Sequence, residues 1–133
     1  MRTMKRSDGF TVIEIIVAIL FLGAVTTILL IQKGNLSATT RDNERKAAIN
    51  AMYYNLEEVY YAKNGSYPSS IDSKILTAMD PTLFTDPHGI ALGQSSSDYR
   101  YDGTNCTNST CKSYTLRAKL EKEADYVKTS INK

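Results

Sequence analysis

Glu14 is the first residue of this sequence that suggests a specific chemistry, because it is the one charged side chain in the apolar run 10–31. A carboxylate that faces lipid costs roughly 2.5–3.5 kcal/mol near mid-bilayer and less near the edge. Ionisable residues in such runs commonly serve a function and have a partner. A free α-amino group is the nearest sensible partner, so we expect Glu14 to form an ion pair.

Two cysteines, Cys106 and Cys111, flank a four-residue segment that connects two predicted strands. Residues on either side of a short hairpin loop lie opposite one another, within the Cα separation that a disulfide requires. A redox centre favours the C-x-x-C spacing, and a metal site needs more ligands than two thiols and the single histidine, His88. We therefore predict a structural disulfide in an oxidising, exported location.

Catalytic motifs are absent from the sequence, which contains no G-x-S-x-G, no H-E-x-x-H and no phosphate-binding glycine-rich loop. We expect no enzymatic activity, no catalytic residues, no metal and no other cofactor, and we place His88 in a turn. The alternative is a Ca²⁺ site made of loop carboxylates, although solvated loop acids are the simpler interpretation. The candidate acids are Asp80, Asp86, Asp98 and Asp102.

Nine tyrosines among several cations suggest nucleic-acid binding as a further alternative. Strand alternation sends Tyr99, Tyr101 and Tyr114 to one face and Arg117 and Lys119 to the other, so stacking and phosphate contacts would not coincide. The net charge of +2 is also too small to indicate a nucleic-acid partner. Tyrosines in the core are therefore favoured, and nucleic-acid binding remains unsupported.

The run 10–31 is predicted to form a membrane-spanning helix, and this helix would position Glu14. At about 1.5 Å per residue it would be roughly 33 Å long, enough to cross the roughly 30 Å hydrocarbon core of a bilayer. Three cations precede the run and one follows closely, so the positive-inside rule keeps residues 1–9 cytoplasmic and exports the rest. A cleaved secretory signal peptide is disfavoured, because the run is too long and Leu36-Ser37-Ala38 is a poor cleavage site. The flanking cations are Arg2, Lys5, Arg6 and Lys33.

The junction between the basic segment and the apolar run carries a resemblance to a known family. Lys5-Arg6-Ser7-Asp8-Gly9 is followed by Phe10-Thr11-Val12-Ile13-Glu14. This resembles the class III leader of type IV pilins and of type II secretion pseudopilins: a basic segment ending in Gly, then Phe, then a hydrophobic helix with Glu at its fifth position. In that family a prepilin peptidase cuts after the Gly and N-methylates the new terminal residue. The resemblance implies cleavage between Gly9 and Phe10 and methylation of Phe10.

The resemblance also implies that copies of the protein assemble into a filament. In a filament core Glu14 of one subunit would neutralise the Phe10 ammonium of its neighbour and set axial register. The implied function is a structural subunit, a major pilin, of a type IV pilus that serves adhesion, motility or DNA uptake. Its implied partners are identical subunits, the prepilin peptidase, an assembly platform with minor pilins, and the cytoplasmic membrane before it joins an extracellular filament. A pseudopilin of a secretion or competence apparatus and a signal-anchored binding domain that never polymerises remain as alternatives.

The helix is predicted to continue beyond the membrane. An apolar stripe at helical spacing follows, with Arg45, Lys46, Glu57 and Glu58 mostly off it. We predict a helix from about Phe10 to Lys63, ended by a left-handed cap at Asn64-Gly65 and by Pro68. The stripe consists of Ile49, Met52, Tyr53, Leu56, Val59 and Tyr60.

After the helix we predict loops with a short helix at 74–79, then a half-buried hairpin and a third edge strand at 124–128. Tyr114, Leu116, Ala118 and Leu120 should share the buried face of the second strand. Two glycosylation sequons, 105–107 and 108–110, fall in the hairpin, although such short patterns often arise by chance.

The fold class is thus α+β, a long N-terminal helix packed on a small antiparallel sheet, with a length of 133 residues that suits one domain. The predicted segments are a cleaved leader (1–9), the transmembrane and polymerisation half of the helix (10–31), its amphipathic half (32–65), a connecting loop region (66–98) and the sheet with its disulfide (99–133).

Overall fold

The computed structural model of the protein describes residues 9–132, and for Asn35 the backbone only. Most of the predicted leader, residues 1–8, lies outside the described residues. The chain divides into two compact units, Met1–Ser37 and Ala38–Lys133, and helix α1 (Val12–Tyr54) runs from the first into the second.

The N-terminal helix is continuous in sequence but changes its winding near the end. After α1 the backbone forms a π-helix, η1 (Asn55–Tyr61), and then one final α-helical turn, α2 (Ala62–Asn64). Gly65 ends the helix with φ of 63°, and its N–H donates to the Tyr61 carbonyl at 2.8 Å. The predicted left-handed cap is confirmed, and glycine takes this conformation without the steric cost of a side chain.

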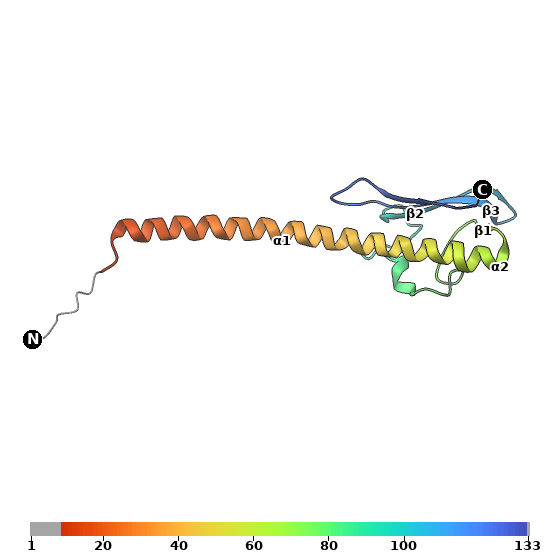
Figure 1. Cartoon of the computed structure of the whole chain (residues 1–133), viewed down its shortest axis with the longest axis horizontal. Coiled ribbons are helices and arrows are strands. Elements are labelled where there is room, and N and C mark those ends of the chain that lie inside the picture. Colours follow the sequence, from red (N-terminus) through yellow and green to blue (C-terminus); the bar gives the residue numbers. More distant parts are fainter. Residues whose placement is uncertain (1–8, 133) are drawn as a thin grey trace, which may run out of the picture. The chain divides into compact units, whose positions relative to one another are not determined.

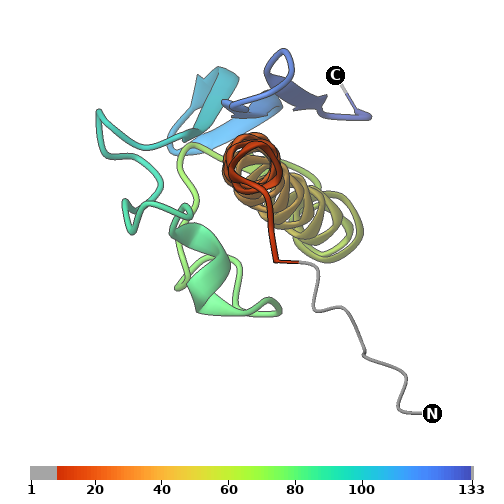
Figure 2. The same cartoon turned by 90° about the vertical axis from the view of Figure 1, so that its left-hand side faces the viewer.

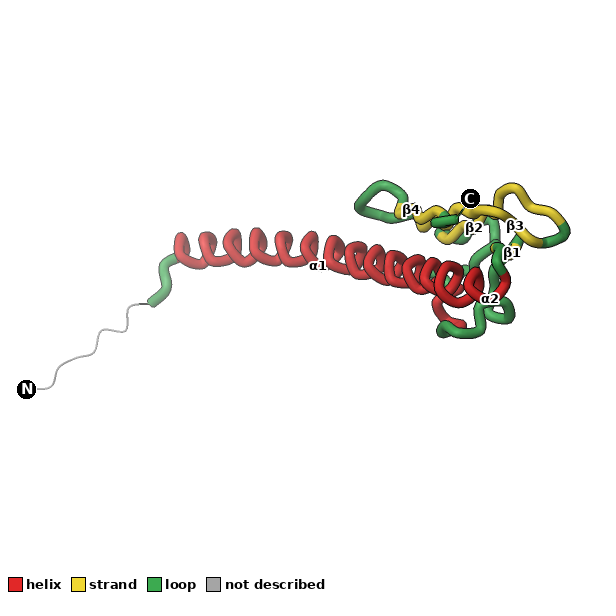
Figure 3. The backbone as a smooth tube through the Cα atoms, turned by 45° about the vertical axis from the view of Figure 1, so that its right-hand side comes forward, coloured by secondary structure: helices red, strands yellow, loops and turns green. Residues whose placement is uncertain are grey.

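The second unit contains a four-stranded antiparallel sheet built around one central strand (Figures 1 and 3). β3 (Thr110–Ala118) pairs along its whole length with β2 (Tyr99–Thr107). Its other edge pairs with β1 (Tyr67–Pro68) near the hairpin tip and with β4 (Tyr126–Thr129) at the far end. The predicted hairpin and edge strand are confirmed, and β1 adds a strand inside the region expected to be loop.

The hydrophobic core of this unit lies between the helix and the sheet. Figure 2 shows the sheet along one side of the helix, with the 3₁₀-helix η2 (Pro81–Phe84) and its flanking loops along another. Ile49, Met52 and Leu56 of the predicted stripe are fully buried, and the four alternating residues of β3 and its extension are buried opposite them. Those four are Tyr114, Leu116, Ala118 and Leu120.

Several details of the sequence prediction are wrong, among them the place of the short helix, the exposure of two charged residues and the burial of Val59, which is 42% exposed. Residues 74–79 form turns, and the short helix lies instead at η2, where Asp80 accepts the Thr82 N–H and Pro81 begins the helical turn. Arg45 and Glu57 were expected off the apolar stripe, yet both are buried. Both side chains find several hydrogen-bond partners inside the fold, which offsets the cost of removing their charges from water.

The α+β class is confirmed: an N-terminal helix with an apolar first half is followed by a small antiparallel sheet that packs on its second half. This is a pilin-like architecture.

Candidate functional site

The predicted cleavage bond lies directly before the helix. Gly9 and Phe10 are exposed and non-helical, and the Phe10 side chain is 80% exposed. An exposed, non-helical segment is sterically accessible to a peptidase. Cleavage after Gly9 and methylation of Phe10 stay predictions.

Glu14 has a local partner at the start of α1. Its Oε2 accepts the backbone N–H of Thr11 at 3.4 Å, and the Thr11 carbonyl accepts the N–H of Glu14 at 3.0 Å. This is the acidic half of a capping box, in which a Glu three residues after the cap satisfies the cap's own N–H. The T-x-x-E signature at Thr11 could have revealed this role from the sequence. The carboxylate also lies at the positive end of the helix dipole.

The apolar half of α1 leaves its large side chains exposed. From Phe10 to Leu36 the large hydrophobic residues are each between 37% and 80% exposed. Two hydroxyls within this stretch donate inside the helix, Thr26 to the Leu22 carbonyl at 2.8 Å and Thr27 to the Gly23 carbonyl at 2.9 Å. Such internal bonding suits apolar surroundings. The described chain thus has one helix long and apolar enough to span a membrane, consistent with a membrane anchor or a signal sequence.

Arg45 is the centre of a buried ionic network that ties the helix to the rest of the second unit. Its side chain is 1% exposed, yet it donates to Asp42 at 2.9 Å, to Glu121 at 2.8 Å and to Asp98 at 2.8 Å. Nε2 of His88 lies 3.0 Å from its Nη2. Arg41 adds a two-pronged contact to Glu121 at 2.7 and 2.6 Å. The guanidinium fork therefore links three separate stretches of chain.

Two carboxylates of this network, Glu121 and Asp42, have lowered pKa values that favour their charged forms. Hydrogen bonds from Arg41 and then Arg45 lower the pKa of Glu121 to about 2. Burial opposes ionisation of Asp42, but the N–H groups of Glu121 and Lys122, each at 2.9 Å, and Arg45 outweigh it and lower its pKa. Asp42 therefore fixes the chain just after β3.

The four acids proposed as Ca²⁺ ligands have separate roles, and Asp102 lies within strand β2. Asp86 is buried and accepts the N–H groups of His88, Ile90 and Asp98, each at 2.9 Å. Burial opposes its ionisation, yet these three bonds lower its pKa. Asp80 caps η2, and Asp98 bonds Arg45. Within the described ranges, no group of three or more His, Cys, Asp or Glu side chains could hold a metal ion.

A second buried carboxylate, Glu57, sits among tyrosines. It accepts the hydroxyl of Tyr67 at 2.7 Å, the hydroxyl of Tyr114 at 2.8 Å and the N–H of Ile131 at 3.2 Å. Burial and then the bond to Glu57 raise the pKa of Tyr114, so it stays a donor. Tyr114 also lies edge-on to Tyr67 and stacked on Tyr101. These tyrosines thus belong to the core, which removes the stacking platform of the nucleic-acid alternative.

The predicted disulfide between Cys106 and Cys111 is present. The two residues are direct partners in the β2–β3 register, and pairing continues to Thr107 and Thr110. The turn is therefore tighter than the predicted four-residue loop. Its central residues, Asn108 and Ser109, have φ of 50° and 70°, which suits a two-residue turn with positive φ.

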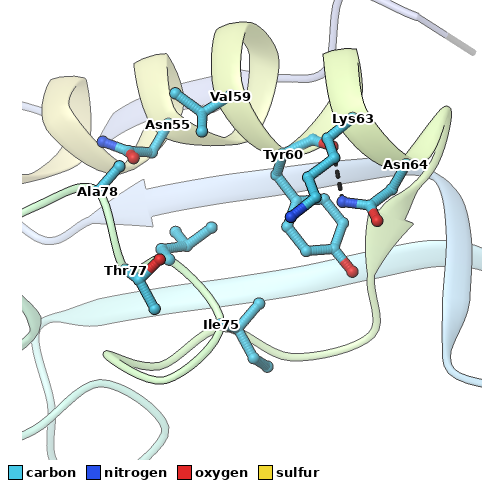
Figure 4. A pocket seen from close by; sticks show the side chains of 9 residues that line it. Asn55, Val59, Tyr60, Lys63, Asn64, Ile75, Thr77 and Ala78 are labelled. Carbon is cyan, nitrogen blue, oxygen red and sulfur yellow. Dashed lines mark hydrogen bonds between the residues drawn. The ribbon is translucent and has the colours of Figure 1, made fainter.

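A groove of about 230 Å³ lies between the end of the helix and the loop 75–78 (Figure 4). Asn55 contributes to its wall, with Nδ2 bonded to the Ala51 carbonyl at 3.2 Å and a buried Oδ1 that has no partner among the described residues. The rest of its lining includes Val59, Lys63 and Ile75. These residues contain no nucleophile paired with a base and no metal-ligand set, so the groove supports no catalytic assignment.

The structure thus places Gly9, Phe10 and Glu14 at one helix start and the two cysteines at a hairpin tip. The Arg45 network and the Glu57 cluster were missed, because their partners are far apart in sequence. Comparisons with protein-family models, curated proteins and solved structures find no match to this chain.

Proposed function

We propose that this protein is a structural subunit of a type IV pilus. It is held in the cytoplasmic membrane as a precursor, cleaved between Gly9 and Phe10 by a prepilin peptidase, N-methylated on Phe10 and polymerised through 10–31. It has no enzymatic role. Its partners are identical subunits, an assembly platform and minor pilins.

The observation that carries this proposal is the exposed apolar helix surface that begins directly after a Gly9–Phe10 bond and leads into a small sheet domain. Side chains from Phe10 to Leu36 remain exposed in the single chain. Burying apolar surface is favourable by about 25 cal/mol per Å², so lipid or other copies of the helix must cover it. A filament core made of such helices covers it after export.

Leader processing tests the proposal. Co-expression with a prepilin peptidase should shorten the chain by its nine leader residues, 1–9, and add one methyl group at Phe10, both visible by intact-mass spectrometry. Gly9→Val should block the change because the added side chain obstructs the scissile bond, whereas Gly23→Ala should be processed normally. If Gly9→Val is processed as completely as the unaltered protein, the proposal is contradicted.

A pseudopilin of a secretion or competence apparatus shares every feature named above. Electron microscopy of the cell surface separates the two, because a pilus subunit builds long external filaments and a pseudopilin builds a short periplasmic one.

A non-polymerising anchored domain is the second candidate, favoured by one specific contact. Glu14 already accepts the Thr11 N–H at 3.4 Å, so a neighbouring subunit is not needed to give it a partner. An intact 1–9 segment in the purified membrane protein would favour this candidate.

A further inference from the structure

Two arginines face each other on the outer side of the sheet. The β2–β3 register makes Arg100 the direct partner of Arg117. Their neighbours Tyr99, Leu116 and Ala118 are buried toward the helix, so strand alternation directs both arginines to the opposite face. Lys119, two residues after Arg117, shares that face. Like charges placed directly opposite one another destabilise an antiparallel pair.

These three cations lack acidic partners, in contrast to three cations of the helix. Arg41, Arg45 and Lys46 each form an ion pair of 2.9 Å or less. Across residues 9–132, no carboxylate lies within ion-pair distance of Arg100, Arg117 or Lys119. Within the same residues, their side chains form one hydrogen bond, which Arg100 donates to the Ser95 carbonyl at 3.4 Å. The arrangement therefore leaves positive charge uncompensated.

The three cations line a common groove of about 270 Å³ with the serine run 95–97. Two acids also line it. Asp98 also bonds Arg45 at 2.8 Å, a cation that it shares with Asp42 and Glu121. The groove thus offers three cations against two lining acids, Asp98 and Asp125, together with hydroxyl donors from the serines.

We infer that this groove binds the phosphate group of a phosphate monoester. A monoester carries about −1.5 to −2 charges at neutral pH, so the three cations attract it more strongly than a singly charged anion, and arginine forks donate pairwise to its oxygens. A sulfate ester or a carboxylate carries one charge and is attracted less strongly.

A phosphodiester chain such as DNA fits the observations less well. Long polyanions need an extended basic track, and Arg41, Arg45 and Lys46 of the neighbouring helix are already paired with acids. Tyr99 and Tyr114 are buried, so they offer no aromatic platform beside the arginines.

The inference does not depend on polymerisation, because the groove belongs to residues 95–125 of the second unit.

The test is calorimetric titration of the full chain in detergent micelles with phenyl phosphate, using phenyl sulfate and a single-stranded DNA oligonucleotide without terminal phosphates as comparison probes. We expect one phenyl phosphate per chain and weaker binding of both other probes. Arg117→Gln and Lys119→Gln should each weaken phenyl phosphate binding about tenfold or more. Lys112→Gln removes a cation of the same strand that lies outside the groove, and it should bind as the unaltered protein does.

Ligand-free stability separates binding from folding. Arg117→Gln removes one member of a repelling pair, so its unfolding temperature should equal or exceed that of the unaltered protein. If Arg117→Gln unfolds, Lys119→Gln, which lies just beyond β3, decides the outcome. The inference is overturned if phenyl phosphate does not bind, if phenyl sulfate or the oligonucleotide binds as well or better, or if the folded variants bind phenyl phosphate unchanged.

Discussion

At the scale of single residues, Glu14 combines a charge with a capping position. Its carboxylate bonds the Thr11 N–H at the start of α1, and in the proposed filament its negative charge would pair with the terminal amine of another subunit. A capping box accepts Gln as well as Glu, whereas an ion pair requires the charge. The two roles can therefore be separated by substitution.

For Glu14 we predict the same loss of filaments from two variants, both of which should keep normal leader cleavage. Glu14→Gln keeps a capping acceptor and removes the charge, and Glu14→Ala removes both. If the charge sets filament register, both variants should lower filament yield on the cell surface by about tenfold or more. The reason is that an ammonium group would be left without a charged partner in an apolar core. Filaments at normal yield from Glu14→Gln would reduce the role of Glu14 to capping.

Arg45 illustrates how a buried charge becomes necessary to a fold. Arg45→Ala leaves Asp42, Asp98 and Glu121 without their shared cation. We expect a loss of about 3–5 kcal/mol in the free energy of unfolding of the second unit, the usual cost of removing one partner of a buried ion pair. Urea unfolding in micelles, followed by tyrosine fluorescence, measures this. Lys46→Ala removes the more exposed pair with Glu123 and should cost no more than about 1 kcal/mol.

The same network, together with the buried Asp86, predicts sensitivity to acid. The pKa values of Asp42 and Asp86 are lowered in the folded protein, and that of Glu121 is lowered to about 2. Their stabilising contribution is therefore complete above the unfolded values, about pH 4.5, and is lost as the pH falls toward 2. The unfolding temperature should decline over that interval. Arg45→Ala should decline less steeply, and an equal slope would argue against the network as the cause.

At the scale of elements, the hairpin tip depends on a glycine as much as on its disulfide. A Cβ on Gly103 would lie 2.7 Å from Sγ of Cys111 and 3.2 Å from Sγ of Cys106. A disulfide sulfur cannot rotate away as a free side chain can. The close approach of the disulfide to the backbone of β2 therefore requires glycine at position 103.

We predict that Gly103→Ala and removal of the disulfide are coupled. Gly103→Ala alone should cost about 1–3 kcal/mol through overpacking. The double variant Cys106→Ala/Cys111→Ala should cost about 2 kcal/mol, because the closed loop is short. In that background Gly103→Ala should cost less than about 0.5 kcal/mol, since the obstructing sulfurs are gone. Additive losses in a double-mutant cycle of unfolding free energies would show that Gly103 acts independently of the disulfide.

At the scale of the whole molecule, the two units of the chain suit two different environments. The first unit exposes apolar side chains, and the second buries its own core. A structural disulfide and an ionic network stabilise the second unit, which suits an exported domain. The membrane orientation should then follow from charges at the N-terminus.

We predict that alkaline phosphatase fused after Lys133 is active, because the positive-inside rule places that end outside the cytoplasm. Replacing Arg2, Lys5 and Arg6 with Asn should lower the activity several-fold at equal expression, and Lys33→Asn should not. Full activity after loss of the three N-terminal cations would contradict this orientation mechanism.

Local patterns in the sequence were sufficient for much of this architecture. The helix end at Asn64-Gly65, the alternating burial of β3 and the Cys106–Cys111 pair all depend on neighbours a few residues apart. The apolar run and its single Glu14 likewise follow from composition alone, because hydrophobic length and charge are properties of a local segment.

Only the tertiary structure decided which polar residues are buried and what they bind. Arg45 meets Asp98 and Glu121, and Glu57 meets Tyr114, across more than fifty residues of chain, and β1 forms because β3 offers an edge to Tyr67 and Pro68. The same holds for the Arg100–Arg117 pair, whose proximity follows from strand register. Helical and strand periodicities classify residues by polarity, so they cannot predict a buried charge whose partners come from distant elements.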